Sequence, residues 1–168
     1  MQNCFPREVH FYLPFTINDR KLTREGKELR ANQFLNWGQK FYEAAILLRQ
    51  NNYDGAVTKH LVCQSLEILL KGILLKIDFD KYNNNKNLKK IGHDLEECLK
   101  YYKEHQNIIG VIVDNNIEQQ IKEINFYYKK HFLRYASIFS LFIPLEKINI
   151  DSIDKFIKNL ILKIENIT

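Results

Sequence analysis

Residues 53–77 read YDGAVTKHLVCQSLEILLKGILLKI, a stretch whose apolar side chains point in nearly every direction around a helix. A helix that is apolar on all sides must be enclosed by other protein elements or by lipid. Here charged and polar residues interrupt the run well short of the roughly 18 uncharged apolar residues that a membrane-spanning helix needs. The stretch therefore predicts the central helix of a soluble helical bundle.

Four polar side chains follow one face of this expected helix. His60, Gln64, Glu67 and Lys71 are separated by steps of four, three and four residues, the spacing of a single helix face. One interpretation is that Glu67 and Lys71 form a partly buried ion pair that fixes the register of the helix. The other is a polar cleft, in which a cation, a carboxylate and an imidazole hold a phosphate and move a proton.

The composition is that of one ordinary soluble domain: 168 residues, 45% hydrophobic and 27% charged. Only six glycines and three prolines argue against a turn-rich all-β fold. The cysteines, Cys4, Cys63 and Cys98, form no CxxC pair, so we expect a reducing compartment, no disulfide framework and no metal site. The N-terminus does not resemble a signal peptide, and we expect a cytoplasmic protein without membrane contact. The net charge of +5 permits contact with nucleic acid without requiring it.

Apolar periodicity predicts an all-α fold, an antiparallel bundle of about five helices. The expected helices cover residues 32–50, 53–77, 95–105, 115–130 and 152–167, with Asp54, Asp94 and Asp151 as N-caps. In the first helix the expected inward stripe is Phe34, Trp37, Phe41, Ala44, Ala45 and Leu48. The bundle domain would cover residues 31–168, and residues 1–30 would form an irregular N-terminal arm packed on it.

Two connecting segments differ in how well they can be interpreted. Residues 78–90 read DFDKYNNNKNLKK, a polar loop with little to bury. Residues 107–113, NIIGVIV, could extend the preceding helix, bend it or form a short strand.

Several motifs, taken in order, resemble the HEPN family, the helical domain of higher eukaryotes and prokaryotes nucleotide-binding proteins. A helix with aromatic and Ala-Ala positions leads into a Gln-x-x-Glu-x-x-x-Lys helix, and a Gly-His-Asp-Leu helix start and an Arg-Tyr pair follow. In this chain the motif residues are Gln64, Glu67 and Lys71, then Gly92, His93, Asp94 and Leu95, then Arg134 and Tyr135. The resemblance covers residues 32–166.

The resemblance implies an antiparallel helical bundle that forms a homodimer. Many HEPN proteins are metal-independent ribonucleases or toxins of defence and toxin–antitoxin systems, and others are non-catalytic modules that associate with RNA or nucleotide. Catalytic members carry an arginine followed, after four to six residues, by a histidine, and both face the scissile phosphate across the dimer. Here Phe139, Ser140 and Leu141 occupy the positions after Arg134 where that histidine would lie. The chain is therefore similar to the non-catalytic members.

Three further candidate residues have both a structural and a functional interpretation. His93 precedes a helix start, where it could cap or pack, or bind an anion at the helix N-terminus. Arg134 could pair with Glu67 or Asp94 inside the bundle, or face a phosphate with Tyr135 beside it. His131 could act in acid–base chemistry. The basic and aromatic side chains around it, among them Lys129, Lys130 and Tyr128, could bind single-stranded RNA or could be a helix end whose lysines extend to solvent.

Three hypotheses for function follow. The first is a non-catalytic HEPN-like module that associates with RNA or nucleotide, in a defence or toxin–antitoxin system, without a cofactor. The second is an atypical ribonuclease that uses Arg134 with His131 or His93. The third is an antitoxin or complex subunit without a nucleic-acid role, whose apolar residues 139–144, FSLFIP, dock on a cognate partner protein.

Overall fold

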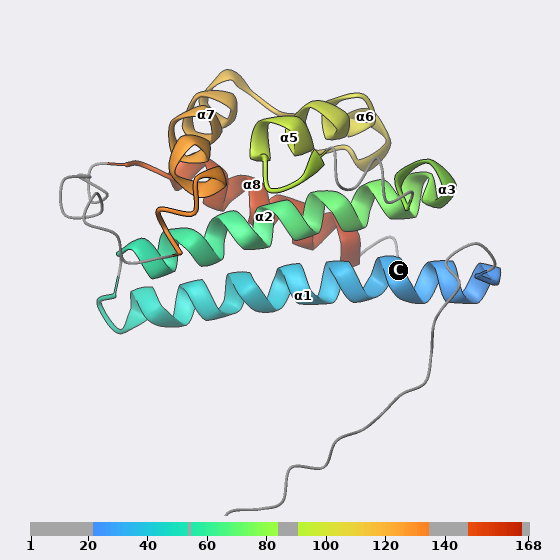
Figure 1. The fold of residues 1–168 in the computed structure, drawn as a ribbon, viewed down its shortest axis with the longest axis horizontal. Coiled ribbons are helices and arrows are strands. Elements are labelled where there is room, and N and C mark those ends of the chain that lie inside the picture. The colour runs from blue at the N-terminus through green and yellow to red at the C-terminus, as the bar shows by residue number, and fades with distance from the viewer. Residues whose placement is uncertain (1–21, 54, 84–90, 135–147, 166–168) are drawn as a thin grey trace, which may run out of the picture.

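The computed structural model describes residues 22–53, 55–83, 91–134 and 148–165, and within these ranges the chain forms seven helices and no strand (Figure 1). The helices are α1 (Arg24–Gln50), α2 (Ala56–Ile77), α3 (Phe79–Tyr82), α5 (Leu95–Lys103), α6 (Gln106–Ile109), α7 (Asn115–Lys129) and α8 (Asp151–Glu165). The all-α prediction is confirmed. The five long helices correspond to those that periodicity indicates, and the short helices α3 and α6 are additions to it.

Protein elements enclose α2, as its apolar character on all sides predicts. It contacts α1, α3, α5 and α8, and Figure 1 shows it running between α1 and the group formed by α5, α6 and α7. Fourteen of its 22 residues are buried, and Val62, Leu66 and Leu70 are 0% exposed. The centre of the hydrophobic core is therefore α2.

In the described ranges, no helix combines the length and apolarity that crossing a membrane requires.

The antiparallel helices α1 and α2 approach each other closely at two glycines. A Cβ atom added at Gly38 would lie 2.6 Å from Leu69 Cγ, and one at Gly72 would lie 2.6 Å from Leu35 Cδ2. Each leucine fills the space that the opposite glycine leaves open. The buried Ser65 hydroxyl also donates a hydrogen bond to the Gly38 carbonyl oxygen, at 2.7 Å. This close contact fixes the position of α1 relative to the polar face of α2.

Replacing Gly38 or Gly72 by alanine is expected to lower the free energy of unfolding by about 1–3 kcal/mol, because the added methyl group forces the packed helices apart. Gly26→Ala is the matched control on α1. Its Cβ would meet its nearest neighbour, Leu22, at 3.4 Å, an ordinary contact. This variant is expected to gain up to about 0.5–1 kcal/mol from helix propensity. Urea unfolding measures all three variants, and equal effects would contradict the close approach at Gly38 and Gly72.

The predicted inward stripe of α1 is wrong in part. The buried residues of α1 are Ala31, Leu35, Gly38, Tyr42 and Ala45. Trp37, which was expected to face inward, is 55% exposed. The prediction favoured the largest apolar side chains, but two helices that touch closely need small residues at the contact. The large side chains therefore lie beside the contact, along its edges.

Two helix starts also differ from the prediction. α1 begins at Arg24, before the expected start at residue 32, because the Thr23 hydroxyl caps it and accepts the Gly26 N–H at 3.2 Å. Asp151 does not cap α8 but is its first residue. The Asp151 N–H donates to Asn149 Oδ1 at 2.8 Å, and the next N–H donates to Gln120 Oε1 of α7 at 2.9 Å. The expected cap Asp54 lies outside the described residues.

The connections contain more structure than their sequences indicate. Residues 79–82 form α3 instead of a loop, and Tyr82 is 1% exposed, with its hydroxyl 3.0 Å from His105 Nε2. Phe79 also packs against the core, so two aromatic residues anchor a segment that is otherwise polar. In the 107–113 stretch, α6 ends at Ile109, its C-cap Gly110 has a left-handed φ of 75°, and no strand follows. Residues 1–21, 84–90 and 135–147 lie outside the described part of the chain. They include most of the expected N-terminal arm, of which only residues 22–30 are described, and the whole FSLFIP segment.

Candidate functional site

Glu67 lies at the centre of a buried polar network that joins three parts of the fold. Its Oε1 accepts a hydrogen bond from Lys71 Nζ at 2.6 Å. Its Oε2 accepts one from the Tyr128 hydroxyl of α7 at 2.6 Å and lies 3.1 Å from His93 Nδ1. Lys71 Nζ also donates to the Gly92 carbonyl oxygen at 2.6 Å. The network therefore connects α2 to α7 and to the turn that precedes α5.

The environment of Glu67 and Lys71 matches the structural interpretation of this pair. Their side chains are only 3% and 11% exposed, and the Glu67 carboxylate has partners on both oxygens. Burial, followed by the negative charge of Glu67, raises the pKa of Tyr128 above its ordinary value, so the phenol stays protonated and donates. A buried ion pair with this many partners holds elements in register, and either residue is costly to remove alone.

His60 lies one turn before Gln64, at the edge of this network. Its ring packs against the Tyr128 ring, with 5.6 Å between the centroids. Its buried Nδ1 has no hydrogen-bond partner among the described residues. Burial lowers the pKa of His60 below 6.5, and the positive charges of Arg134, His131 and His93 act in the same direction. The imidazole of His60 is therefore neutral near pH 7.

Two more histidines and an arginine lie close enough to His60 for their charges to act on it. The His93 and His131 rings are in edge contact, with 5.8 Å between their centroids. His131 belongs to the turn after α7 and has a left-handed φ of 60°, and the Arg134 N–H donates to its carbonyl oxygen at 3.0 Å. We call His60, His93, His131 and Arg134 the basic cluster. Its members come from α2, from the turn before α5 and from the turn after α7.

Most candidate residues predicted from the sequence thus come together in space. His60, Gln64, Glu67 and Lys71 lie on one face of α2, and His93, His131 and Arg134 lie next to that face. The Gln64 side-chain oxygen is 3.1 Å from the Tyr128 hydroxyl. Tyr135 lies outside the described residues.

The helix N-terminus beside His93 is already occupied by protein groups. Asp94 Oδ1 accepts the N–H groups of Glu96 and Glu97 at 3.1 and 3.3 Å, and the Leu95 N–H donates to Asn125 Oδ1 at 2.9 Å. Because these donors are used, the end of α5 has little capacity to bind an anion, and His93 instead contacts Glu67 and His131.

Asn125 is a structural residue of this region that sequence reasoning missed. It is 0% exposed, and its amide nitrogen donates to Asp94 and to Glu96 at 2.9 and 2.7 Å. Asp94, one of the partners suggested for Arg134, also accepts from Lys129 at 3.3 Å. Burial alone would raise the pKa of Asp94, but these hydrogen bonds outweigh it and lower the pKa. A single asparagine on a polar helix gives no sequence signal of such a role.

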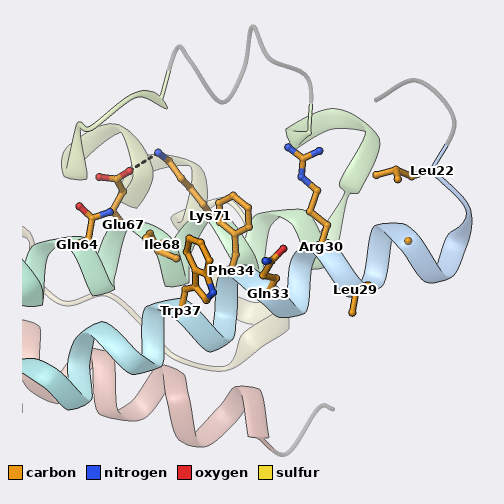
Figure 2. A pocket seen from close by; sticks show the side chains of 11 residues that line it. Leu22, Leu29, Arg30, Gln33, Phe34, Trp37, Gln64, Glu67, Ile68 and Lys71 are labelled. Atoms are coloured by element: carbon orange, nitrogen blue, oxygen red, sulfur yellow. Dashed lines mark hydrogen bonds and ion pairs between the residues drawn. The ribbon is translucent and has the colours of Figure 1, made fainter. Parts of the chain in front are cut away.

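A groove of about 740 Å³ lies along α1 and α2 beside the network (Figure 2). α1 contributes Leu29, Arg30, Gln33, Phe34 and Trp37, and α2 contributes Gln64, Glu67, Ile68 and Lys71. Each helix contributes both apolar and polar side chains, and the aromatic ones, Phe34 and Trp37, come from α1. Sequence analysis missed the position of Trp37 in this groove because an aromatic residue in an apolar stripe is more often part of a core.

The site offers acid–base and anion-binding groups rather than metal ligands. Among the described residues, no group of three His, Cys, Asp or Glu side chains is placed to hold a metal ion. Cys63 and Cys98 are buried, and burial raises the pKa of both thiols. The titratable groups that lie together here are imidazoles, a guanidinium group and a buried ion pair.

Lowering the pH is expected to destabilise the protein through His60. In the unfolded chain His60 has its ordinary pKa of 6.5, and in the folded protein its pKa is lower. The stability that this difference contributes is present above pH 6.5 and is lost as the pH falls towards the folded-state pKa. The cations around His60 oppose its protonation, whereas Glu67 favours it.

His60→Phe keeps a ring against Tyr128 and removes the titrating group. We expect the unfolding midpoint in urea to fall less between pH 7.5 and pH 5.5 in this variant than in the wild-type protein. The same pH dependence in both proteins would show that His60 does not contribute.

Comparison with protein-family models, with curated proteins and with solved structures found no match to this chain.

Proposed function

We propose that the protein is a non-catalytic, HEPN-like helical module that binds RNA or nucleotide through the basic cluster. The observation that carries the proposal is the proximity of the four residues of the basic cluster, which come from three separate segments of the fold. Guanidinium and imidazole groups are the donors that phosphate oxygens favour.

The charges near the cluster support an anionic ligand. Lys71 forms an ion pair with Glu67 within the network, so these two charges largely offset each other. The histidines can add positive charge when a phosphate approaches, since a nearby anion favours their protonated form. The chain as a whole carries a formal charge of +5, which favours association with a polyanion.

Titration with a short single-stranded RNA at two salt concentrations tests the proposal. We expect binding at low salt that weakens as salt rises, and a loss of about tenfold or more in affinity for Arg134→Gln. The control is Lys155→Gln, which removes one exposed positive charge on α8. It is expected to bind within about twofold of the wild-type protein. Absence of binding at low salt, or equal weakening by both variants, would contradict the proposal.

One observation favours a second candidate, an atypical metal-independent ribonuclease. His60 is neutral near pH 7, because burial and the positive charges of Arg134 and His131 lower its pKa. A neutral imidazole can accept the proton of an RNA 2′-hydroxyl as its oxygen attacks the adjacent phosphorus, and a protonated one can donate to the leaving 5′-oxygen. The products would be a 2′,3′-cyclic phosphate and a 5′-hydroxyl. We prefer the non-catalytic function because the chain lacks the arginine and histidine at the spacing of the family's ribonuclease motif.

An RNA cleavage assay separates the two candidates. If the protein is a ribonuclease, His60→Phe and Arg134→Gln should each abolish the formation of cyclic phosphate ends. Equal residual cleavage by the wild-type protein and both variants would mean that a contaminant causes it.

The proposal also includes a homodimer and a role in a defence or toxin–antitoxin system with a cognate partner protein. The family resemblance is the support for this part. Light scattering tests the dimer, and a toxin or nucleotidyltransferase encoded in the neighbouring reading frame would support the paired system. A monomer at micromolar concentration would contradict the dimer.

A further inference from the structure

The groove beside the basic cluster has aromatic and apolar side chains in its lining, which phosphate binding does not require. Trp37 stands 55% exposed in its wall, beside Phe34 of α1 and Ile68 of α2 (Figure 2). Such a large aromatic surface in a groove favours an occupant with flat apolar faces. The volume of about 740 Å³ falls within the range of about 300–1,000 Å³ that is usual for small-molecule sites.

The polar groups of the groove complement the rest of such an occupant. Gln33 and Gln64 contribute side-chain amides, which can donate to and accept from the polar edge of a base. Arg30 contributes positive charge, whereas Lys71 is paired with Glu67. An aromatic surface, amides and a cation together match a nucleotide, whose base is flat and whose phosphate is anionic.

Gln64 connects the groove to the basic cluster. Its side chain lines the groove and lies 3.1 Å from the Tyr128 hydroxyl, and the Tyr128 ring packs on His60. A ligand that extends past Gln64 would therefore contact both regions.

We infer that the groove is a nucleobase subsite, in which the base of a bound RNA nucleotide stacks on Trp37 while its phosphate lies at the basic cluster. This inference rests on the proposed function and names the part of the ligand that the groove takes. Trp37 is a binding residue in it, and Gln64 lies between the base and the phosphate. Lys71 offsets the charge of the Glu67 carboxylate, and the Tyr128 hydroxyl donates a hydrogen bond to it, so its repulsion of the ligand is reduced.

Trp37 is the single tryptophan of the chain, so its fluorescence reports on the groove directly. The full-length protein is titrated with AMP, adenosine, ribose 5-phosphate and an oligoadenylate, and a free tryptophan derivative corrects for collisional quenching. We expect AMP and the oligoadenylate to quench Trp37, adenosine to do so more weakly, and ribose 5-phosphate to leave the emission unchanged.

Two variants, each of which lacks one aromatic side chain, test base stacking through the affinity for the oligoadenylate. Trp37→Leu is expected to weaken binding of the oligoadenylate by about 5- to 100-fold, the range for the loss of one base–aromatic stack. Tyr53→Leu is the control, since Tyr53 is 68% exposed and does not line the groove. It is expected to bind as the wild-type protein does.

The outcomes separate this inference from the proposed function. If Arg134→Gln weakens RNA binding while Trp37→Leu does not and the emission is unchanged, the groove is not a base subsite and the proposed function stands. If no RNA binds at low salt and no nucleotide quenches Trp37, both are overturned. A change in Trp37 emission with protein concentration alone would assign the groove to a second copy of the chain and overturn the inference.

Discussion

Replacing Lys71 by methionine is expected to destabilise the protein by about 3–5 kcal/mol, the cost of leaving a buried charge without its partner. The variant keeps Glu67 buried and removes its bond to Lys71 at 2.6 Å, and it also removes the donor to the Gly92 carbonyl oxygen. Urea unfolding at pH 7 measures the loss.

A double-mutant cycle distinguishes the buried pair from an ordinary surface pair. Glu67→Gln combined with Lys71→Met should cost much less than the sum of the single changes, because no uncompensated charge remains. The comparison is the exposed pair of Lys100 and Glu97, 3.8 Å apart, where Lys100→Met should cost less than about 1 kcal/mol. A loss below about 1 kcal/mol for Lys71→Met would show that water reaches the pair.

This result decides which residues can be used to test function. Changes at Glu67 and Lys71 would weaken the fold and binding together, so a loss of RNA binding in them could not be assigned to the site. Arg134 is exposed and Trp37 is half-exposed, so changes at these two positions should disturb the fold less, and they are the better choices.

Replacing Leu66 by alanine is expected to lower the free energy of unfolding by about 2–5 kcal/mol, the usual cost of a cavity in a core. Leu66 is 0% exposed on the helix that the rest of the described chain encloses. Leu47→Ala on α1 is the matched control. Leu47 is 60% exposed, and its replacement should change stability by no more than about 0.5 kcal/mol.

Similar losses in the two leucine variants would contradict the central position of α2. Thermal unfolding followed by circular dichroism provides a second measurement, because a loss of this size should lower the melting temperature by several degrees in a chain of 168 residues.

The sequence predicted which residues share a helix face more accurately than it predicted which helices and side chains touch. The polar face of α2 was readable because its spacing depends on helix geometry alone. The burial of Trp37 was predicted wrongly, because periodicity identifies an apolar stripe but not which of two adjacent stripes makes the contact. The contributions of Tyr128 and Asn125 could not be predicted, since each depends on a partner far away in the chain.

The sequence alone determined that the described chain is helical and that α2 lies at its centre, because apolar residues on every side of one helix must be covered by other elements. It also placed His60, Gln64, Glu67 and Lys71 on a common face. Only the tertiary structure decided which groups meet that face. Glu67 meets the Tyr128 hydroxyl and His93, which lie far from it in the sequence. The groove lies beside Trp37 because the glycine contacts between α1 and α2 set how these two helices pack. Such contacts depend on shape at ångström scale, which a pattern of residue types does not contain.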